Sequence, residues 1–231
     1  MDKNETFNAK ITGSFFILAA VSSIVGLKLY DPILANSNLM LTASNYYSRI
    51  IFGSINELIL AVSATGTGIM LFPILKRYSE SIGLGYLSFR ILEVVFICIG
   101  TISILTALSV SEYYTNGTIQ NEDDAKNLMF IFTSIHKWTF ILGPNFMLAI
   151  NTFLYSYVLL KIKVIPQNHS RLGLVASLLI MTAAILELFG IIKQISTWGI
   201  ILALPIAFYE MTLAVWLIVK GIRNFPETQS E

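Results

Sequence analysis

The chain has 231 residues, of which 55% are hydrophobic and only 13% are charged. Soluble domains carry about a quarter charged residues, so this composition argues against a soluble globular domain. Lys and Arg total 15 against 14 Asp and Glu, and the basic residues form no cluster, so we predict no nucleic-acid partner.

Six long apolar blocks follow one another along the chain. A helix needs about 20 residues to cross about 30 Å of hydrocarbon, and each block reaches that length. Strands of a membrane barrel would instead show short alternating stretches. We therefore predict an all-helical integral membrane protein, a single domain over residues 1–231 that lies in a lipid bilayer. The predicted helices cover approximately 11–29, 50–75, 82–110, 128–160, 172–192 and 198–219.

The positions of lysine and arginine predict the orientation, because cytoplasmic segments are enriched in both. With the N-terminus inside, nine basic residues fall in cytoplasmic segments and five fall outside. The nine are Lys3, Lys10, Lys76, Arg77, Lys161, Lys163, Arg171, Lys220 and Arg223. Since six spans return the chain to its starting side, we expect both termini in the cytoplasm.

Two prolines fall in the middle of predicted spans, Pro144 in "LGPNF" and Pro205 in "LALPIAF". Each removes one backbone hydrogen bond and should bend its helix or free a carbonyl group. Such a break serves packing alone, or it opens a polar pocket in which the freed backbone groups find partners.

Seven polar or ionisable side chains interrupt the predicted spans. A charge at the middle of the bilayer costs about 2.5–3.5 kcal/mol even on the lenient insertion scale. These side chains should therefore face one another, water or a bound group, and they are the candidate ion- or substrate-binding residues. By depth, Glu57, His136 and Glu187 lie towards the outer ends, while Arg90, Glu93, Asn145 and Glu210 lie nearer the middle.

Arg90 and Glu93 are spaced i, i+3, so they share one helix face and can pair directly. Glu210 is the carboxylate nearest to them in depth, and we predict that it joins their network, with Asn145 as a neutral neighbour. If both acids ionise, the network carries one net negative charge, which a proton or a cation would compensate. Two alternatives stay open: Arg90 reaches the cytoplasmic headgroups along its own stem, or the pairing is purely structural.

Five stretches of the chain stand out in their order and spacing: "GSINELILA" with Glu57, "FRILEVV" with Phe89, Arg90 and Glu93, "HKWTFILGPNF" with His136, Gly143, Pro144 and Asn145, "LELFG" with Glu187, and "YEMTLAVWLIVKGI" with Glu210, Trp216, Lys220 and Gly221. Together they resemble the prokaryotic six-helix membrane family catalogued as domain of unknown function 4386. The resemblance implies six helices, a prokaryotic plasma membrane and functional residues at the intramembrane charges, but no activity. Family members usually have Pro-Arg followed by an aromatic residue in the loop between helices four and five. The corresponding segment here, "IPQNHSRLGL", departs from that pattern, so the resemblance implies no role for this loop.

Three functions fit these residues. The first is a transporter or binding protein for a cation, a proton or a small polar solute. The second is a non-catalytic accessory or sensor protein, and the third is an intramembrane enzyme that uses His136 with a carboxylate. The sequence contains no HExxH, no phosphate-binding glycine loop, no GxSxG and no Cys-His cluster, so we predict no catalytic residue, metal site or cofactor.

Overall fold

A computed structural model describes residues 3–34 and 41–222, and this part of the chain is built of helices without a strand. Six of its helical segments are long and apolar enough to cross a membrane, which confirms the predicted fold class of a multi-pass membrane protein. The elements are α1 (Lys3–Leu29), α2 (Asp31–Leu34), η1 (Ala43–Tyr46), α4 (Tyr47–Tyr78), α5 (Glu80–Thr115), α6 (Glu122–Phe140), η2 (Ile141–Met147), α7 (Leu148–Ile162), α8 (Gln167–Leu188) and α9 (Thr197–Val219).

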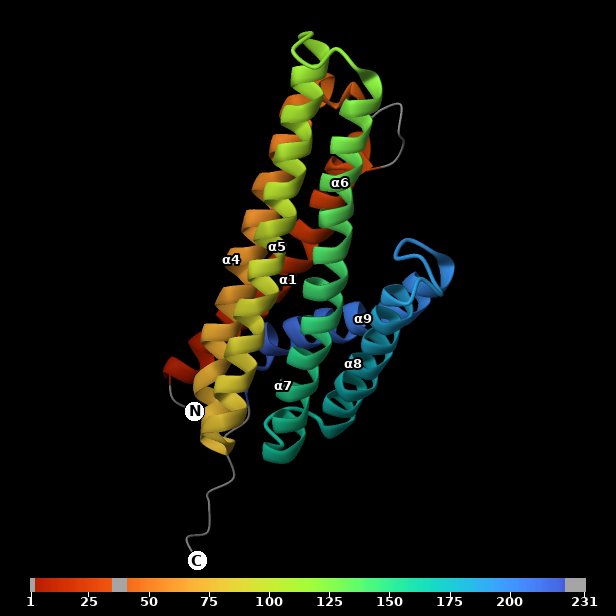
Figure 1. Cartoon of the computed structure of the whole chain (residues 1–231). Coiled ribbons are helices and arrows are strands. Elements are labelled where there is room, and N and C mark those ends of the chain that lie inside the picture. Colours follow the sequence, from red (N-terminus) through yellow and green to blue (C-terminus); the bar gives the residue numbers. More distant parts are fainter. Residues whose placement is uncertain (1–2, 35–40, 223–231) are drawn as a thin grey trace, which may run out of the picture.

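The six spans differ in length. At 1.5 Å per residue the 36 residues of α5 extend about 54 Å, whereas the 22 residues of α8 extend about 33 Å. The turn between α5 and α6 therefore stands well beyond the loop between α8 and α9 (Figure 1). We call the end of the molecule with the α5–α6 turn the upper end, and the end where α4 and α7 finish the lower end.

The long helix formed by α6, η2 and α7 lies at the centre of the bundle, in contact with both α5 and α8 (Figure 1). Helices that follow one another along the chain also pack together, and α1 fills the place between α4 and α9. The approach of α1 to α9 requires a glycine, because a Cβ atom on Gly13 would lie 2.5 Å from the carbonyl oxygen of Ala214.

Pro144 lies within η2, a seven-residue π-helical segment between α6 and α7. Because proline has no N–H and clashes with the preceding turn, it cannot continue an α-helical ladder unchanged, and the wider π-turn accommodates it. The predicted break in the fourth span is thus confirmed at Pro144. Pro205, in contrast, lies inside α9, which continues as an α-helix on both sides of it.

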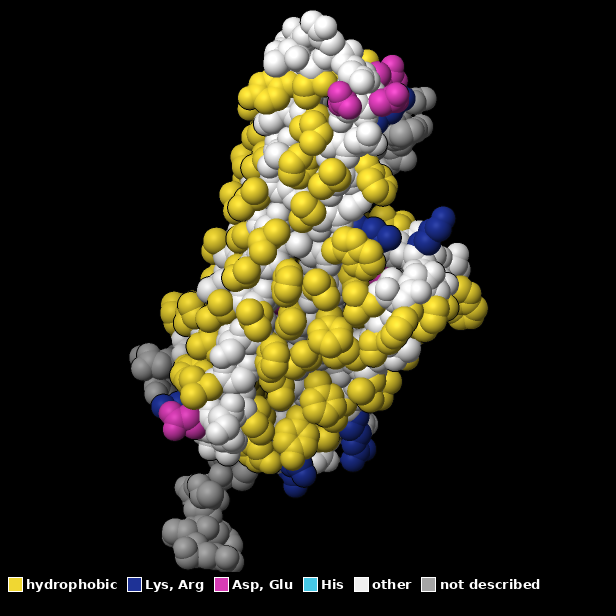
Figure 2. All heavy atoms as spheres, viewed as in Figure 1, with side chains coloured by type: hydrophobic (Ala, Val, Ile, Leu, Met, Phe, Trp, Pro, Cys, Tyr) yellow, Lys and Arg dark blue, Asp and Glu magenta, His cyan; other side chains and the backbone are white. Residues whose placement is uncertain are grey.

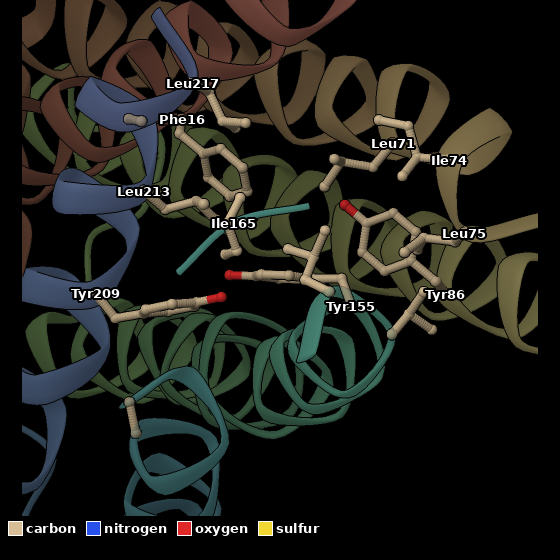
Figure 3. Packing of buried hydrophobic residues seen from close by; sticks show 14 of the residues in the cluster. Phe16, Leu71, Ile74, Leu75, Tyr86, Tyr155, Ile165, Tyr209, Leu213 and Leu217 are labelled. Carbon is tan, nitrogen blue, oxygen red and sulfur yellow. The ribbon is translucent and has the colours of Figure 1, made fainter. Parts of the chain in front are cut away.

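A cluster of buried hydrophobic and tyrosine side chains fills the lower half of the bundle (Figure 3). It draws on α1, α4, α5, α7, α8 and α9, and Val164 and Ile165 from the α7–α8 connection also belong to it. The outer surface is also hydrophobic, and Figure 2 shows such side chains covering the face between the charged ends. The exposed hydrophobic side chains can contact lipid, whereas those of the buried cluster contact only other parts of the protein.

Candidate functional site

Arg90 and Glu93 form a buried ion pair in the first half of α5, as their spacing predicts. The Arg90 Nη1 atom lies 2.8 Å from Glu93 Oε2, and the two side chains are only 3% and 5% exposed. The Nδ2 atom of Asn151 on α7 donates to the same carboxylate oxygen at 2.7 Å. Glu93 is therefore held by two donors from two different helices.

The remaining donors of Arg90 point into the bundle rather than to the headgroups. Its Nε and Nη2 atoms donate to Thr67 Oγ1 on α4 at 3.0 and 2.8 Å, and Nε also donates to the Ala64 carbonyl oxygen at 3.2 Å. Because every nitrogen of the guanidinium group has a partner inside the protein, the snorkelling alternative is wrong.

Glu210 on α9 does not join this network directly, which corrects the predicted contact with Arg90. No ion pair links the two side chains in the described part of the chain, where the Arg90 nitrogens instead donate to Thr67, Ala64 and Glu93. The Oε1 atom of Glu210 is buried and has no hydrogen-bond partner among the described residues. A buried carboxylate oxygen in this position is open to a ligand or a proton.

The Arg90–Glu93 pair and Glu210 line a common cavity of about 230 Å³, the central cavity. Arg90, Glu93, Asn145 and Glu210 contribute its charged and amide groups, Ser23 adds a hydroxyl group, and Pro144 also borders it. The remaining lining is apolar and comes mainly from α1, α4 and α9. The volume is large enough for several water molecules. The break at Pro144 thus opens onto a polar pocket.

Asn145 lines the central cavity beside Arg90, Glu93 and Glu210, but its hydrogen bond is made elsewhere. Its Nδ2 atom donates to Glu187 Oε2 on α8 at 2.8 Å, so it bonds towards the upper end rather than to Arg90. Both residues line a second cavity of about 480 Å³, the upper vestibule, with Lys28, Asp31 and Gln194. The wall common to the two cavities consists of Phe140, Asn145 and Ala203.

Glu57 and His136 belong to a third group that lines neither cavity. The Glu57 carboxylate packs against Gly26 of α1, where an added Cβ atom would lie 2.8 Å from Oε1. His136 Nδ1 lies 3.4 Å from the Gly100 carbonyl oxygen, and the imidazole meets the Tyr30 ring edge to face at 5.7 Å. Within residues 3–34 and 41–222, no three His, Cys, Asp or Glu side chains gather where they could hold a metal ion.

The sequence analysis missed the polar face of α7, which carries Asn151, Thr152, Tyr155 and Ser156. All four side chains are fully buried, and their spacing of i, i+1, i+4 and i+5 places them on one side of the helix. The signal for this face is present in "NTFLYS", because four polar side chains at helical spacing inside an apolar span require partners.

Residues 11–221 match a family model described as a domain of unknown function (DUF4386). The matched region contains the central cavity, the upper vestibule and the Glu57–His136 group. No curated protein and no solved structure matches the chain.

Proposed function

The chain belongs to the DUF4386 family of membrane proteins, and we propose that it binds and transports a cation or a proton, with Glu210 as the central binding group. The observation that carries this proposal is the buried, unpartnered Oε1 atom of Glu210 beside a cavity of about 230 Å³.

The charges around the cavity support a positively charged ligand. Arg90 and Glu93 neutralise each other at 2.8 Å, so an ionised Glu210 leaves one net negative charge on the lining. An uncompensated charge at this depth costs several kcal/mol. A proton or a monovalent cation cancels that charge, whereas an anion would add to it.

The shape of the cavity limits the size of the ligand. Leu60, Ile97, Ile206 and Met211 make most of the remaining wall apolar around the four polar groups. A small organic amine fits this combination, because its ammonium group can bind the carboxylate while its carbon atoms contact the walls. A bare proton needs only the carboxylate itself.

The ligand is proposed to enter from the upper end. The upper vestibule brings the Glu187 carboxylate to the far side of the Phe140–Asn145–Ala203 wall, where a cation can approach it. Asp31, at the same vestibule, is already paired with Lys28 at 3.9 Å and Arg49 at 3.7 Å. Below the central cavity the hydrophobic cluster of Figure 3 closes the bundle. Transport then requires the lower half to open after the upper wall has closed, the alternation common to membrane transporters.

We place the lower end in the cytoplasm of a prokaryotic cell, with the protein in the plasma membrane. Exposed Lys76, Arg77, Lys161 and Lys163 lie where α4 and α7 end, and this enrichment follows the positive-inside rule. α1 begins and α9 ends on the same side, because six spans separate these two points.

A thermal-shift series in detergent tests the proposed binding. We expect the wild-type melting temperature to rise with at least one member of a panel of alkali cations and small amines. A ligand at 100 times its Kd stabilises a folded protein by about 2.7 kcal/mol. The shift should shrink at acidic pH, because protons compete for the carboxylate, and it should be absent in Glu210→Gln.

Glu80→Gln is the matched control, because Glu80 is exposed and pairs with Lys76 at 2.9 Å at the lower end. This variant should keep the full ligand response. If no cation shifts the wild type at any pH, and Glu210→Gln melts at the same temperature as the wild type, the binding proposal is wrong. The accessory or sensor function would then be favoured.

A further inference from the structure

Three buried tyrosines connect the region of the central site to the lower end of the bundle. Tyr86 on α5, Tyr155 on α7 and Tyr209 on α9 are all fully buried within the cluster of Figure 3. The ring centroids of Tyr86 and Tyr155 lie 5.8 Å apart, and those of Tyr155 and Tyr209 lie 5.9 Å apart. In Figure 3 the hydroxyl groups of Tyr155 and Tyr209 point towards each other.

Several polar atoms in this cluster lack a partner. In the described part of the chain, the hydroxyl groups of Tyr86, Tyr155 and Thr152 are buried without a hydrogen bond, while Ser156 Oγ donates to the Tyr209 hydroxyl at 2.8 Å. Leaving a buried polar group unpaired costs about 1–3 kcal/mol, so nearly all such groups bind protein or ordered water. Three such hydroxyl groups in one cluster are therefore free to bond to one another or to bridging water.

The upper end of this cluster meets the central site at two points. Tyr209 precedes Glu210 on α9, and Tyr155 shares the polar face of α7 with Asn151, which donates to Glu93 at 2.7 Å. The Oδ1 atom of Asn151 is a further buried acceptor without a partner among the described residues. Polar side chains thus lead from Glu93 through Asn151 along α7 to Tyr155, and Tyr209 adjoins Glu210 in the backbone of α9.

The lower end of the cluster meets His169, in the first turn of α8. The His169 ring centroid lies 5.1 Å from that of Tyr209. The side chain is only partly buried, while its Nε2 atom is buried and has no partner within the described residues. One ring can therefore exchange a proton both with the tyrosine cluster and with water at the lower surface.

Gly173 allows α8 to pack closely against Ser156 and Tyr209. A Cβ atom at this position would lie 2.3 Å from both Ser156 Oγ and Tyr209 Cζ. Only glycine lets α8 approach closely enough to place His169 over Tyr209, one helical turn earlier.

From these contacts we infer a proton route between Glu210 and the cytoplasm, through the Tyr86–Tyr155–Tyr209 cluster and His169. The inference rests on the proposed protonation of Glu210. Each hydroxyl group and each bridging water accepts one proton and donates another, so none changes its own charge. The proton leaves the Glu210 carboxylic acid, passes along these groups to His169 Nε2, and leaves the imidazolium for bulk water. Arg90 and Glu93 are the other charged groups that line the central cavity at its start.

The test follows the rate at which Glu210 gains a proton. Protein in lipid nanodiscs is given a rapid acid jump, and time-resolved infrared spectroscopy records the carbonyl band of the protonated carboxyl group. Tyr155→Phe removes one unpartnered hydroxyl group and keeps the ring, so the fold should be retained. We expect Tyr155→Phe and His169→Gln to lower the rate at which this band appears by about tenfold or more, with an unchanged final amplitude.

Tyr157→Phe is the matched control, because Tyr157 also lies on α7 but packs against Tyr78 with a centroid distance of 6.1 Å, outside the cluster. This variant should keep the wild-type rate. Wild-type rates in both Tyr155→Phe and His169→Gln would overturn the route and assign proton entry to the upper vestibule. A band of equal amplitude in the wild type and in Glu210→Gln would instead overturn the proposed function, and the route with it. Failure of the route alone would change only the expected rates.

Discussion

Replacing Arg90 with methionine is expected to lower the free energy of unfolding by about 3–5 kcal/mol. The substitution keeps an unbranched side chain but removes the guanidinium group that lies 2.8 Å from Glu93 and donates to Thr67. Glu93 then keeps Asn151 as its hydrogen-bond donor but loses its counter-charge in a site that is 5% exposed. Equilibrium unfolding in mixed micelles measures the loss.

A double variant distinguishes the effect of the unpaired Glu93 carboxylate on stability from the effect of changed packing. Arg90→Met/Glu93→Met removes both charges and should recover most of the lost stability, because replacing a buried ion pair by apolar side chains is often neutral or stabilising. Lys76→Met breaks the exposed pair with Glu80 and should change stability little. If the double variant is as unstable as Arg90→Met alone, the loss comes from packing and not from the unpaired carboxylate.

Gly173→Ala is expected to destabilise the protein by about 1–3 kcal/mol through overpacking. Alanine favours a helix over glycine by about 1 kcal/mol, so the intrinsic propensity alone predicts the opposite sign. The clash prevails because the added methyl group would lie 2.3 Å from both Ser156 Oγ and Tyr209 Cζ, and Tyr209 is fully buried. Thermal unfolding in detergent measures the change.

Gly85→Ala supplies the matched control on α5. The nearest atom to its added methyl group, Leu154 Cδ1, lies at an ordinary contact distance of 3.8 Å. This variant should be neutral or slightly stabilising. Equal melting temperatures for Gly173→Ala and Gly85→Ala would contradict the close packing of α8 against Tyr209.

The spans and the central ion pair could be predicted from the sequence because each depends on local information. Twenty or more apolar residues determine a crossing helix, and the i, i+3 spacing of Arg90 and Glu93 determines that they share a face. Pro144 likewise predicts a local disturbance of its helix, and η2 shows one there, whereas α9 stays α-helical around Pro205.

The partners of these residues across the bundle could not be predicted in the same way. In a membrane protein both the buried and the lipid-facing side chains are apolar, so hydrophobic periodicity does not show which face of a helix turns inward. The choice of Thr67 rather than Glu210 as a partner of Arg90 depends on how α4 and α5 are rotated. The bond from Asn145 to Glu187 depends on the π-turn of η2, which shifts the direction of the side chains that follow.

The most direct measurement of the central claim is an infrared pH titration of wild type, Glu210→Gln and Glu187→Gln at equilibrium. The account predicts a protonated-carboxyl band that falls as pH rises and that loses, in Glu210→Gln, a component retained in Glu187→Gln. The Glu187 carboxylate accepts from Asn145 at the upper wall. Identical bands in wild type and Glu210→Gln would contradict it, because the carboxyl group that titrates would then lie elsewhere.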